Sequence, residues 1–95
     1  MAFFAVVCAD KPGALDQRLA LRPTHVEYLK TQEPIIRVAG PLFDAEGKMC
    51  GSVFVVEADD ISGAKAFSDN DPFTKAGVFG AVKINAFTKT MGSWS

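Results

Sequence analysis

The sequence predicts an α+β domain in which a four-stranded antiparallel sheet carries two helices on one face. The first reason is the order of its patterns, strand-helix-strand-strand-helix-strand, which is the ferredoxin-like split βαβ arrangement. The second reason is size, because 95 residues with 48% hydrophobic content can form one core of their own. The chain has no internal repeat and no low-complexity linker, so we expect a single domain over residues 1–95.

The N-terminal third predicts one strand and one helical region. Residues 3–9 are apolar on both alternating faces, which is typical of a strand buried on both sides. Residues 14–32 then place apolar and polar side chains at helical spacing. Pro23 lies inside this region and lacks a backbone donor, so we expect the helix to break near Leu21 or Arg22 and to restart at Pro23.

The middle of the chain predicts a β-hairpin. Residues 35–39 form a β-branched run that we expect to end at Gly40-Pro41. Turn-forming residues follow at 44–48, and residues 49–57 are again apolar on both faces. The two runs are therefore expected to pair as antiparallel strands.

The C-terminal third predicts a helix, a short helical turn and a last strand. Residues 61–67 repeat apolar side chains at helical spacing, with Asp60 in position to cap the helix. Pro72 suits the first position of a short turn that Gly77 ends, and residues 78–87 read as the final strand.

The predicted sheet needs a second covering layer. Its first and third strands are apolar on both faces, whereas an antiparallel sheet with one wet face alternates apolar and polar residues. Two helices cover one face only, so we expect a second copy of the chain to cover the other, face to face, as a dimeric α+β barrel. The alternative is that side chains from the regions of Pro34 and Ser93 fold over the open face.

Composition excludes several classes of partner. With 10 Lys+Arg against 11 Asp+Glu the net charge is −1, so no basic surface for nucleic acid is expected. Apolar runs are too short to span a membrane, and the N-terminus lacks the features of a signal peptide, so a cytoplasmic protein is expected. Cys8 and Cys50 lie in apolar stretches and are predicted to be buried, reduced thiols. With one histidine, two separated cysteines and no clustered carboxylates, the chain lacks a set of metal ligands, so no metal site is expected.

His25 is the single histidine and the first candidate for chemistry. On a helix it shares a flank with Arg18 and Arg22, so it could titrate in a pocket where the arginines orient an anionic substrate. The structural alternative is a partly buried ring that packs beside Leu29 and donates to a backbone carbonyl.

Asp71 is the second candidate, because the following proline holds it in extended backbone at the start of a turn. It could orient His25 and stabilise the protonated ring, or it could simply cap the turn that follows. Ser68 and Phe73 lie close to Asp71 in the chain and are, with Arg18 and Arg22, the candidates for contact with substrate.

Short motifs spread over nearly the whole chain resemble the YciI-like (YCII) family. The residues that carry the resemblance are Arg18, Arg22-Pro23-Thr24-His25, Ala39-Gly40-Pro41, Gly51-Ser52, Ala64 to Phe67, Asp71-Pro72-Phe73 and Ala76-Gly77-Val78. The resemblance implies a ferredoxin-like fold that dimerises as an α+β barrel, similar to muconolactone isomerase, and a His-Asp active-site pair that falls on His25 and Asp71. One relative in chlorinated-aromatic degradation is a dehydrochlorinase of a chlorinated hydroxyquinol. The family often has tyrosine at the position of Phe73, so that hydroxyl is missing here.

Two functional hypotheses follow from these residues. The first is a cofactor-free lyase or isomerase that acts on a small cyclic or aromatic compound, with His25 as the proton-transfer group and Asp71 as its orienter. The second is a dimeric, non-catalytic module that binds a small molecule or a partner protein. The sequence names no substrate for either one.

Overall fold

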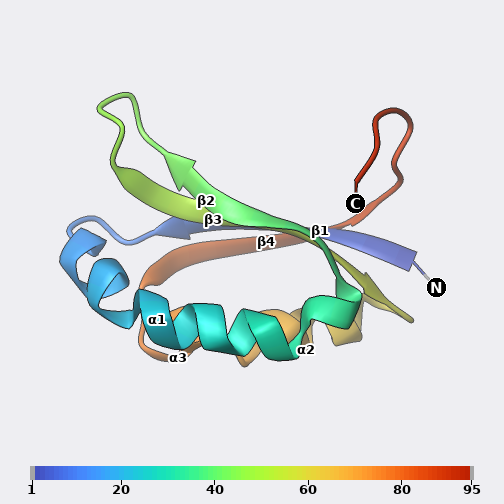
Figure 1. Cartoon of the computed structure of the whole chain (residues 1–95), viewed down its shortest axis with the longest axis horizontal. Helices are drawn as coiled ribbons and strands as arrows, with labels where there is room; N and C mark the ends of the chain where they lie inside the picture. The colour runs from blue at the N-terminus through green and yellow to red at the C-terminus, as the bar shows by residue number, and fades with distance from the viewer. Residues whose placement is uncertain (1, 95) are drawn as a thin grey trace.

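The computed structural model describes residues 2–94 as one antiparallel sheet with all helices on one side (Figure 1). The strand order is β2-β3-β1-β4, so β1 and β3 are central and β2 and β4 are edges. This confirms the predicted α+β class and its ferredoxin-like order of elements. Along the chain the elements are β1 (Ala2–Asp10), α1 (Leu15–Thr31), a 3₁₀ turn (Glu33–Ile35), β2 (Ile36–Phe43), β3 (Met49–Ala58), α2 (Ile61–Asp69), α3 (Pro72–Lys75) and β4 (Phe79–Phe87).

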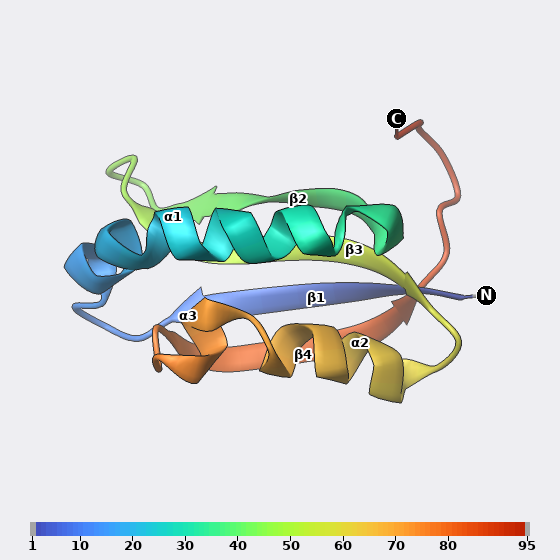
Figure 2. The ribbon, with the colours of Figure 1, turned by 60° about the horizontal axis from the view of Figure 1, so that its bottom comes forward.

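The core lies between the sheet and the helices. Side chains alternate along a strand, so one face of β1 and β3 turns toward the helices and the other turns away. Figure 2 shows α1, α2 and α3 lying over the same face of the sheet. Phe67 of α2 and Phe73 of α3 close this layer from the helical side. The buried residues that the two central strands contribute to it are Phe4, Val6, Cys8, Phe54 and Val56.

α1 runs unbroken through Pro23, and the predicted break near Leu21 or Arg22 is wrong. Proline removes the backbone donor that would reach the carbonyl four residues earlier, on Leu19. Both Pro23 and Leu19 lie on the exposed side of α1, so water can satisfy that carbonyl. The helix is fixed to the rest of the molecule by its two buried side chains, Arg18 and His25.

β2 is longer than predicted because it continues through Gly40-Pro41 to Phe43. Pro41 pairs with Ser52 in the β3 register and sits on an edge strand, where the missing backbone donor need not disrupt a second ladder. The predicted hairpin between β2 and β3 is present, and Asp60 caps α2 by accepting from the backbone of Ser62 and Gly63.

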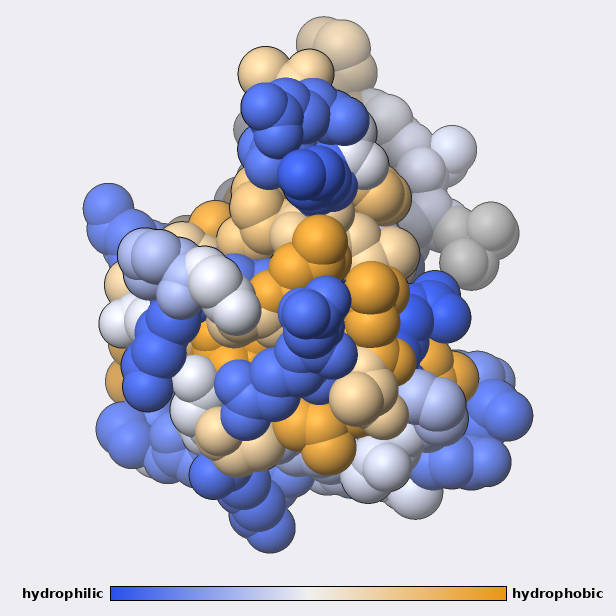
Figure 3. Space-filling model, turned by 90° about the vertical axis from the view of Figure 1, so that its left-hand side faces the viewer, coloured by the Kyte–Doolittle hydropathy of each residue, from blue (hydrophilic) through white to orange (hydrophobic). Residues whose placement is uncertain are grey.

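The sheet face away from the helices is largely uncovered in the single chain. Val7, Val38 and Leu42 are exposed, so the prediction that the first strand is buried on both sides does not hold for one chain. At one end of this face Trp94 packs edge-on against Phe3, with ring centroids 5.3 Å apart. The tail therefore covers a corner of the face, as the sequence alternative allowed, but not its middle. Figure 3 shows hydrophobic surface also exposed at the end of the molecule below the β2-β3 hairpin.

The two cysteines differ in environment. Cys8 is buried in the core, as predicted, but Cys50 is exposed, so the prediction of a buried thiol is wrong there. Cys50 lies beyond the last residue pair of β1 and β3, Ala9 with Gly51, where no third strand flanks it. At Gly51 itself a Cβ would overlap the carbonyl oxygen of Cys8, which explains the glycine.

Among residues 2–94, no helix is long and apolar enough to cross a bilayer.

Candidate active site

His25 and Asp71 meet within one chain, on the helical side of the sheet. The His25 Nδ1 atom lies 2.8 Å from Asp71 Oδ1, and the two residues are 7% and 1% exposed. His25 comes from the middle of α1, whereas Asp71 is the N-cap of α3 and also accepts from the backbone of Phe73 at 2.9 Å. The carboxylate therefore caps a helix and orients the imidazole at once, so the two readings of Asp71 are compatible.

The pairing fixes the tautomer of His25. A carboxylate oxygen only accepts hydrogen bonds, so Nδ1 carries the proton and Nε2 of the neutral ring keeps its lone pair. Phe73 holds the plane of the ring, because the two rings stack with centroids 4.0 Å apart and an 11° angle between planes. Orientation and tautomer are thus both set before any ligand binds.

Arg18 is the centre of a second polar cluster. It is 2% exposed and donates from Nε to Asp10 Oδ2 at 2.7 Å and from Nη2 to Asp10 Oδ1 at 3.1 Å. Nη2 also donates to Ser52 Oγ at 2.7 Å. Its guanidinium carbon lies 4.6 Å from the centroid of the Phe73 ring, so Phe73 contacts both polar clusters.

The Ser52 hydroxyl can still donate one hydrogen bond. Guanidinium has no acceptor, so Ser52 Oγ must accept from Arg18, which leaves its own proton free to donate. Since Ser52 is buried and lines the pocket described next, that proton is available to an acceptor atom inside it.

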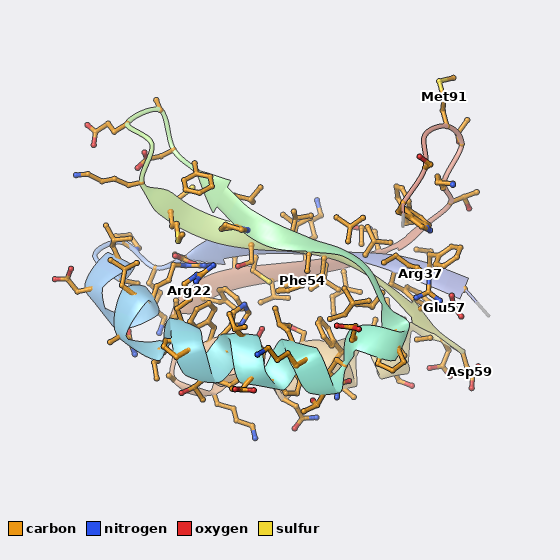
Figure 4. All side chains as sticks on the ribbon, in the orientation of Figure 1. Arg22, Arg37, Phe54, Glu57, Asp59 and Met91 are labelled. Carbon is orange, nitrogen blue, oxygen red and sulfur yellow. The ribbon has the colours of Figure 1, made fainter. Side chains whose placement is uncertain are left out.

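A pocket of about 150 Å³ opens between α1 and the edge strand β2. Figure 4 shows Arg22 and Phe54 in the space between α1 and the sheet that this pocket occupies. Arg22 is exposed and pairs with no acidic side chain among residues 2–94, so it supplies a free positive charge. The lining residues are Arg18, Arg22, His25, Val26, Leu29, Ala39, Gly40, Pro41, Ser52 and Phe54.

The predicted site residues fall into two groups. Arg18, Arg22 and His25 line the pocket, and Asp71 stands behind His25. Ser68 and Phe73, predicted to contact substrate, do not line it. Ser68 is buried in α2, where its carbonyl accepts from Asp71 N, and Phe73 is fully buried beneath the His25 ring.

Two residues of the site, Asp10 and Ser52, are not predicted as functional side chains. Asp10 directly follows the predicted strand of residues 3–9, and Ser52 enters only through the family resemblance. A signal for Ser52 exists, because it is the one hydroxyl in the apolar run of residues 49–56 and it alternates in step with Phe54. For Asp10 the sequence offers no comparable signal.

Burial and the charge of Asp71 shape the neighbouring groups. Burial, together with the Asp71 carboxylate, raises the pKa of Cys8 to about 12 and that of Tyr28 to about 12. Both groups are therefore neutral near pH 7 and cannot serve as bases there. Within the described part of the chain no three His, Cys, Asp or Glu side chains cluster as metal ligands would.

Comparison with known proteins gives a consistent assignment. The family model described as "YCII-related domain" matches residues 2–88. Protein YciI of Escherichia coli is 29% identical, over 90% of this chain and 96% of its own length. An uncharacterized protein of Haemophilus influenzae is 30% identical, over 92% and 97%.

One solved structure is similar in both sequence and fold. It is the 5-chloro-2-hydroxyhydroquinone dehydrochlorinase (TftG) of Burkholderia phenoliruptrix AC1100, in complex with 2,5-dihydroxybenzoquinone. It matches with a TM-score of 0.85 and 33% identity, over 90% of this chain and 93% of that chain.

Proposed function

The chain belongs to the YCII-related family, and from that premise we propose that it is a cofactor-free lyase or isomerase of a small cyclic or aromatic compound. The observation that carries the proposal is the buried His25–Asp71 pair on the wall of the pocket. The similar dehydrochlorinase, a lyase-type enzyme, supports an enzyme of this general kind.

His25 is the proton-transfer group in this proposal. Its Nε2 lone pair can take a proton from carbon or oxygen of the substrate, and Asp71 then stabilises the imidazolium through Nδ1. The same ring can return the proton to another atom of the substrate or to the leaving group. A positioned base of this kind contributes about 100- to 10,000-fold to a rate.

Ser52 and Arg22 stabilise the negative charge that develops on the substrate when a proton is removed. The Ser52 hydroxyl, whose oxygen already accepts from Arg18, donates to an oxygen of the substrate as charge develops there. Arg18 itself is neutralised by Asp10, so its role is to fix Ser52 rather than to bind an anion. The unpaired charge of Arg22 attracts an anionic substrate to the pocket.

The pocket selects ligands of about one ring. A cavity of roughly 150 Å³ lined by apolar side chains is known to accept benzene, and this pocket has about that volume. Val26, Leu29 and Phe54 supply apolar walls for the ring, while the polar groups lie on the His25 and Ser52 side. The bound 2,5-dihydroxybenzoquinone of the similar dehydrochlorinase is a single ring with several oxygens, which fits this description.

We also propose that two copies of the chain pack through their open sheet faces. Val7 on β1 and Val53 on β3 stand opposite each other in the register and point away from the helices. With Val38 and Leu42 they form an apolar surface over three strands that a single chain leaves in water. An isologous contact would bury this surface on both copies without moving the His25–Asp71 pair.

The test begins with the single histidine, whose ring protons can be followed by NMR without ambiguity. In Asp71→Asn the midpoint of the His25 titration should fall, because the carboxylate no longer favours the charged ring. In parallel, chloride release from 5-chloro-2-hydroxyhydroquinone is measured for the parent, His25→Gln and Asp71→Asn. Turnover that is lost in both variants, with folding retained, supports the enzyme.

An unchanged midpoint would contradict the His-Asp mechanism. If the midpoint were unchanged and 2,5-dihydroxybenzoquinone bound to the parent and to His25→Gln with equal affinity, the hypothesis of a non-catalytic binding module would replace that of an enzyme.

A further inference from the structure

Two buried side-chain oxygens next to the His25–Asp71 pair have no hydrogen-bond partner in the described chain. One is Asp71 Oδ2 and the other is Thr74 Oγ1. Asp71 Oδ1, in contrast, accepts twice, from His25 and from the backbone of Phe73. Buried polar atoms are nearly always paired, so two such atoms in one turn call for an explanation.

Both groups belong to the first turn of one short helix. Asp71 is the N-cap of α3 and Thr74 is its third residue, the two positions whose side chains serve the start of a helix in a capping box. The turn itself is fixed by backbone hydrogen bonds, from Lys75 N to Asp71 O at 3.0 Å and from Val78 N to Phe73 O at 2.9 Å. Only the side chains are free to adjust.

The acceptors that compete for the Thr74 hydroxyl are weaker. A helical threonine can donate to a carbonyl three or four residues back. Here these neutral acceptors are Asp71 O, which already accepts from Lys75, and Asn70 O. An ionised carboxylate oxygen with no partner is the stronger acceptor.

We propose that Thr74 is a positioning residue of the His25–Asp71 pair: rotation about its Cα–Cβ bond brings Oγ1 to donate to Asp71 Oδ2. The inference rests on the proposed function, because it assigns a role within the same proton-transfer pair. With Thr74 on Oδ2 and Phe73 N and His25 on Oδ1, both oxygens of the carboxylate are held. The carboxylate cannot turn away from the imidazole, and its charge is shared among three donors.

The consequence for His25 has a definite sign. A donor on Oδ2 draws charge from the carboxylate and weakens its pull on the imidazolium, so the ring gives up its proton more readily. Removing that donor should raise the midpoint of the His25 titration.

The charged and titratable groups around the His25–Asp71 pair must be considered before a shift is assigned to Thr74. The groups that feel the charge of Asp71 are His25 and Tyr28 from α1 and Cys8 from β1, with Arg18 and Asp10 also acting on Cys8. Burial raises the pKa of Cys8 and of Tyr28 to about 12, and arginine keeps its charge throughout.

The experiment compares Thr74→Val with Thr74→Ser. Valine keeps the shape of threonine and removes the hydroxyl, whereas serine keeps the hydroxyl and removes the methyl. The midpoint of the His25 titration is followed by NMR in both variants, in the parent and in Asp71→Asn, and urea unfolding is measured alongside. We expect the midpoint to rise in Thr74→Val and to stay at the parental value in Thr74→Ser.

Two results would overturn the role of Thr74: no shift in Thr74→Val, or an equal shift in both variants. If Thr74→Val loses stability without a shift, the hydroxyl bonds to a backbone carbonyl instead. If Asp71→Asn lowers the midpoint while Thr74→Val does not move it, only the Thr74 inference fails. If Asp71→Asn leaves the midpoint unchanged, the proposed function fails as well.

Discussion

Removal of Asp10 isolates the energetic role of the buried ion pair. In Asp10→Ala the Arg18 guanidinium keeps Ser52 Oγ and the Phe73 ring but loses its two hydrogen bonds to the carboxylate, of 2.7 and 3.1 Å. The side chains of Arg18 and Asp10 are 2% and 6% exposed, so water cannot replace the lost partner without opening the structure.

The expected loss is large for a chain of this size. Breaking a buried ion pair by removing one partner costs about 3 to 5 kcal/mol. A domain of 95 residues has a free energy of unfolding of about 5 to 14 kcal/mol, so the variant should retain between almost none and about four-fifths of it. Since each kcal/mol lowers the midpoint of thermal unfolding by about 4 to 8 °C at this size, the melting temperature should fall by at least about 12 °C.

Urea unfolding followed by far-UV circular dichroism measures the effect, with two variants as controls. Asp69→Ala removes a carboxylate from the exposed ion pair with Lys65, which is 2.7 Å long but mostly in solvent, and should cost only about 0.3 to 0.5 kcal/mol. The double variant Asp10→Leu, Arg18→Met replaces both charges by apolar side chains of similar size and should recover most of the stability lost in Asp10→Ala.

The two controls define what would refute the reasoning. If Asp10→Ala were no more destabilised than Asp69→Ala, the Arg18–Asp10 pair would not be buried as the structure shows. If the double variant were as unstable as Asp10→Ala, lost packing rather than an unpaired charge would explain the effect.

Two further predictions concern the thiols and the open sheet face. Because burial raises the pKa of Cys8 to about 12, about one Cys8 thiol in ten thousand is ionised at pH 8. A thiol reagent should therefore modify only Cys50 in the native chain, and Cys8 only after unfolding. Two rapidly modified thiols in the native protein would contradict the burial of Cys8. If the open sheet face joins two copies, light scattering at micromolar concentration should give twice the chain mass of 10.2 kDa. Val7→Lys should reduce the mass to that of one chain, whereas the control Leu19→Lys, on the exposed side of α1, should leave the dimer intact. A monomeric parent would refute the dimer.

The sequence was sufficient to predict the fold because strand and helix patterns alternate clearly and the turns between them carry Gly, Pro, Asn or Asp. The predicted boundaries of α1 and β2 were wrong where the packing of the element in the fold, and not its local sequence, determines whether it continues. Pro23 predicts a break, but its exposed position on α1 lets the helix continue. Gly40-Pro41 predicts a stop, but on an edge strand it can remain in register with β3.

The candidate site was predictable only in part. His25 and the arginines could be identified from one helical flank, because that geometry is local. The meeting of His25 and Asp71 depends on how α3 packs against α1. The residues alone left this pairing as one of two alternatives, and the family resemblance implied it. The Arg18, Asp10 and Ser52 cluster joins α1, β1 and β3, so no local pattern could place these three side chains together.

The pocket at the sheet edge has two different walls, one built from core residues and one from the edge strand. On one side of the pocket, the His25–Asp71 pair and the Arg18 cluster belong to the core, where a substitution costs folding stability. The facing wall is made of Ala39, Gly40 and Pro41 on the edge strand β2. Larger, smaller or more polar side chains at these three positions would reshape the cavity while most core contacts stayed intact. If His25 and Asp71 are the proton-transfer pair proposed above, substitutions along this one strand would change which ligand fits the pocket while that pair stayed in place.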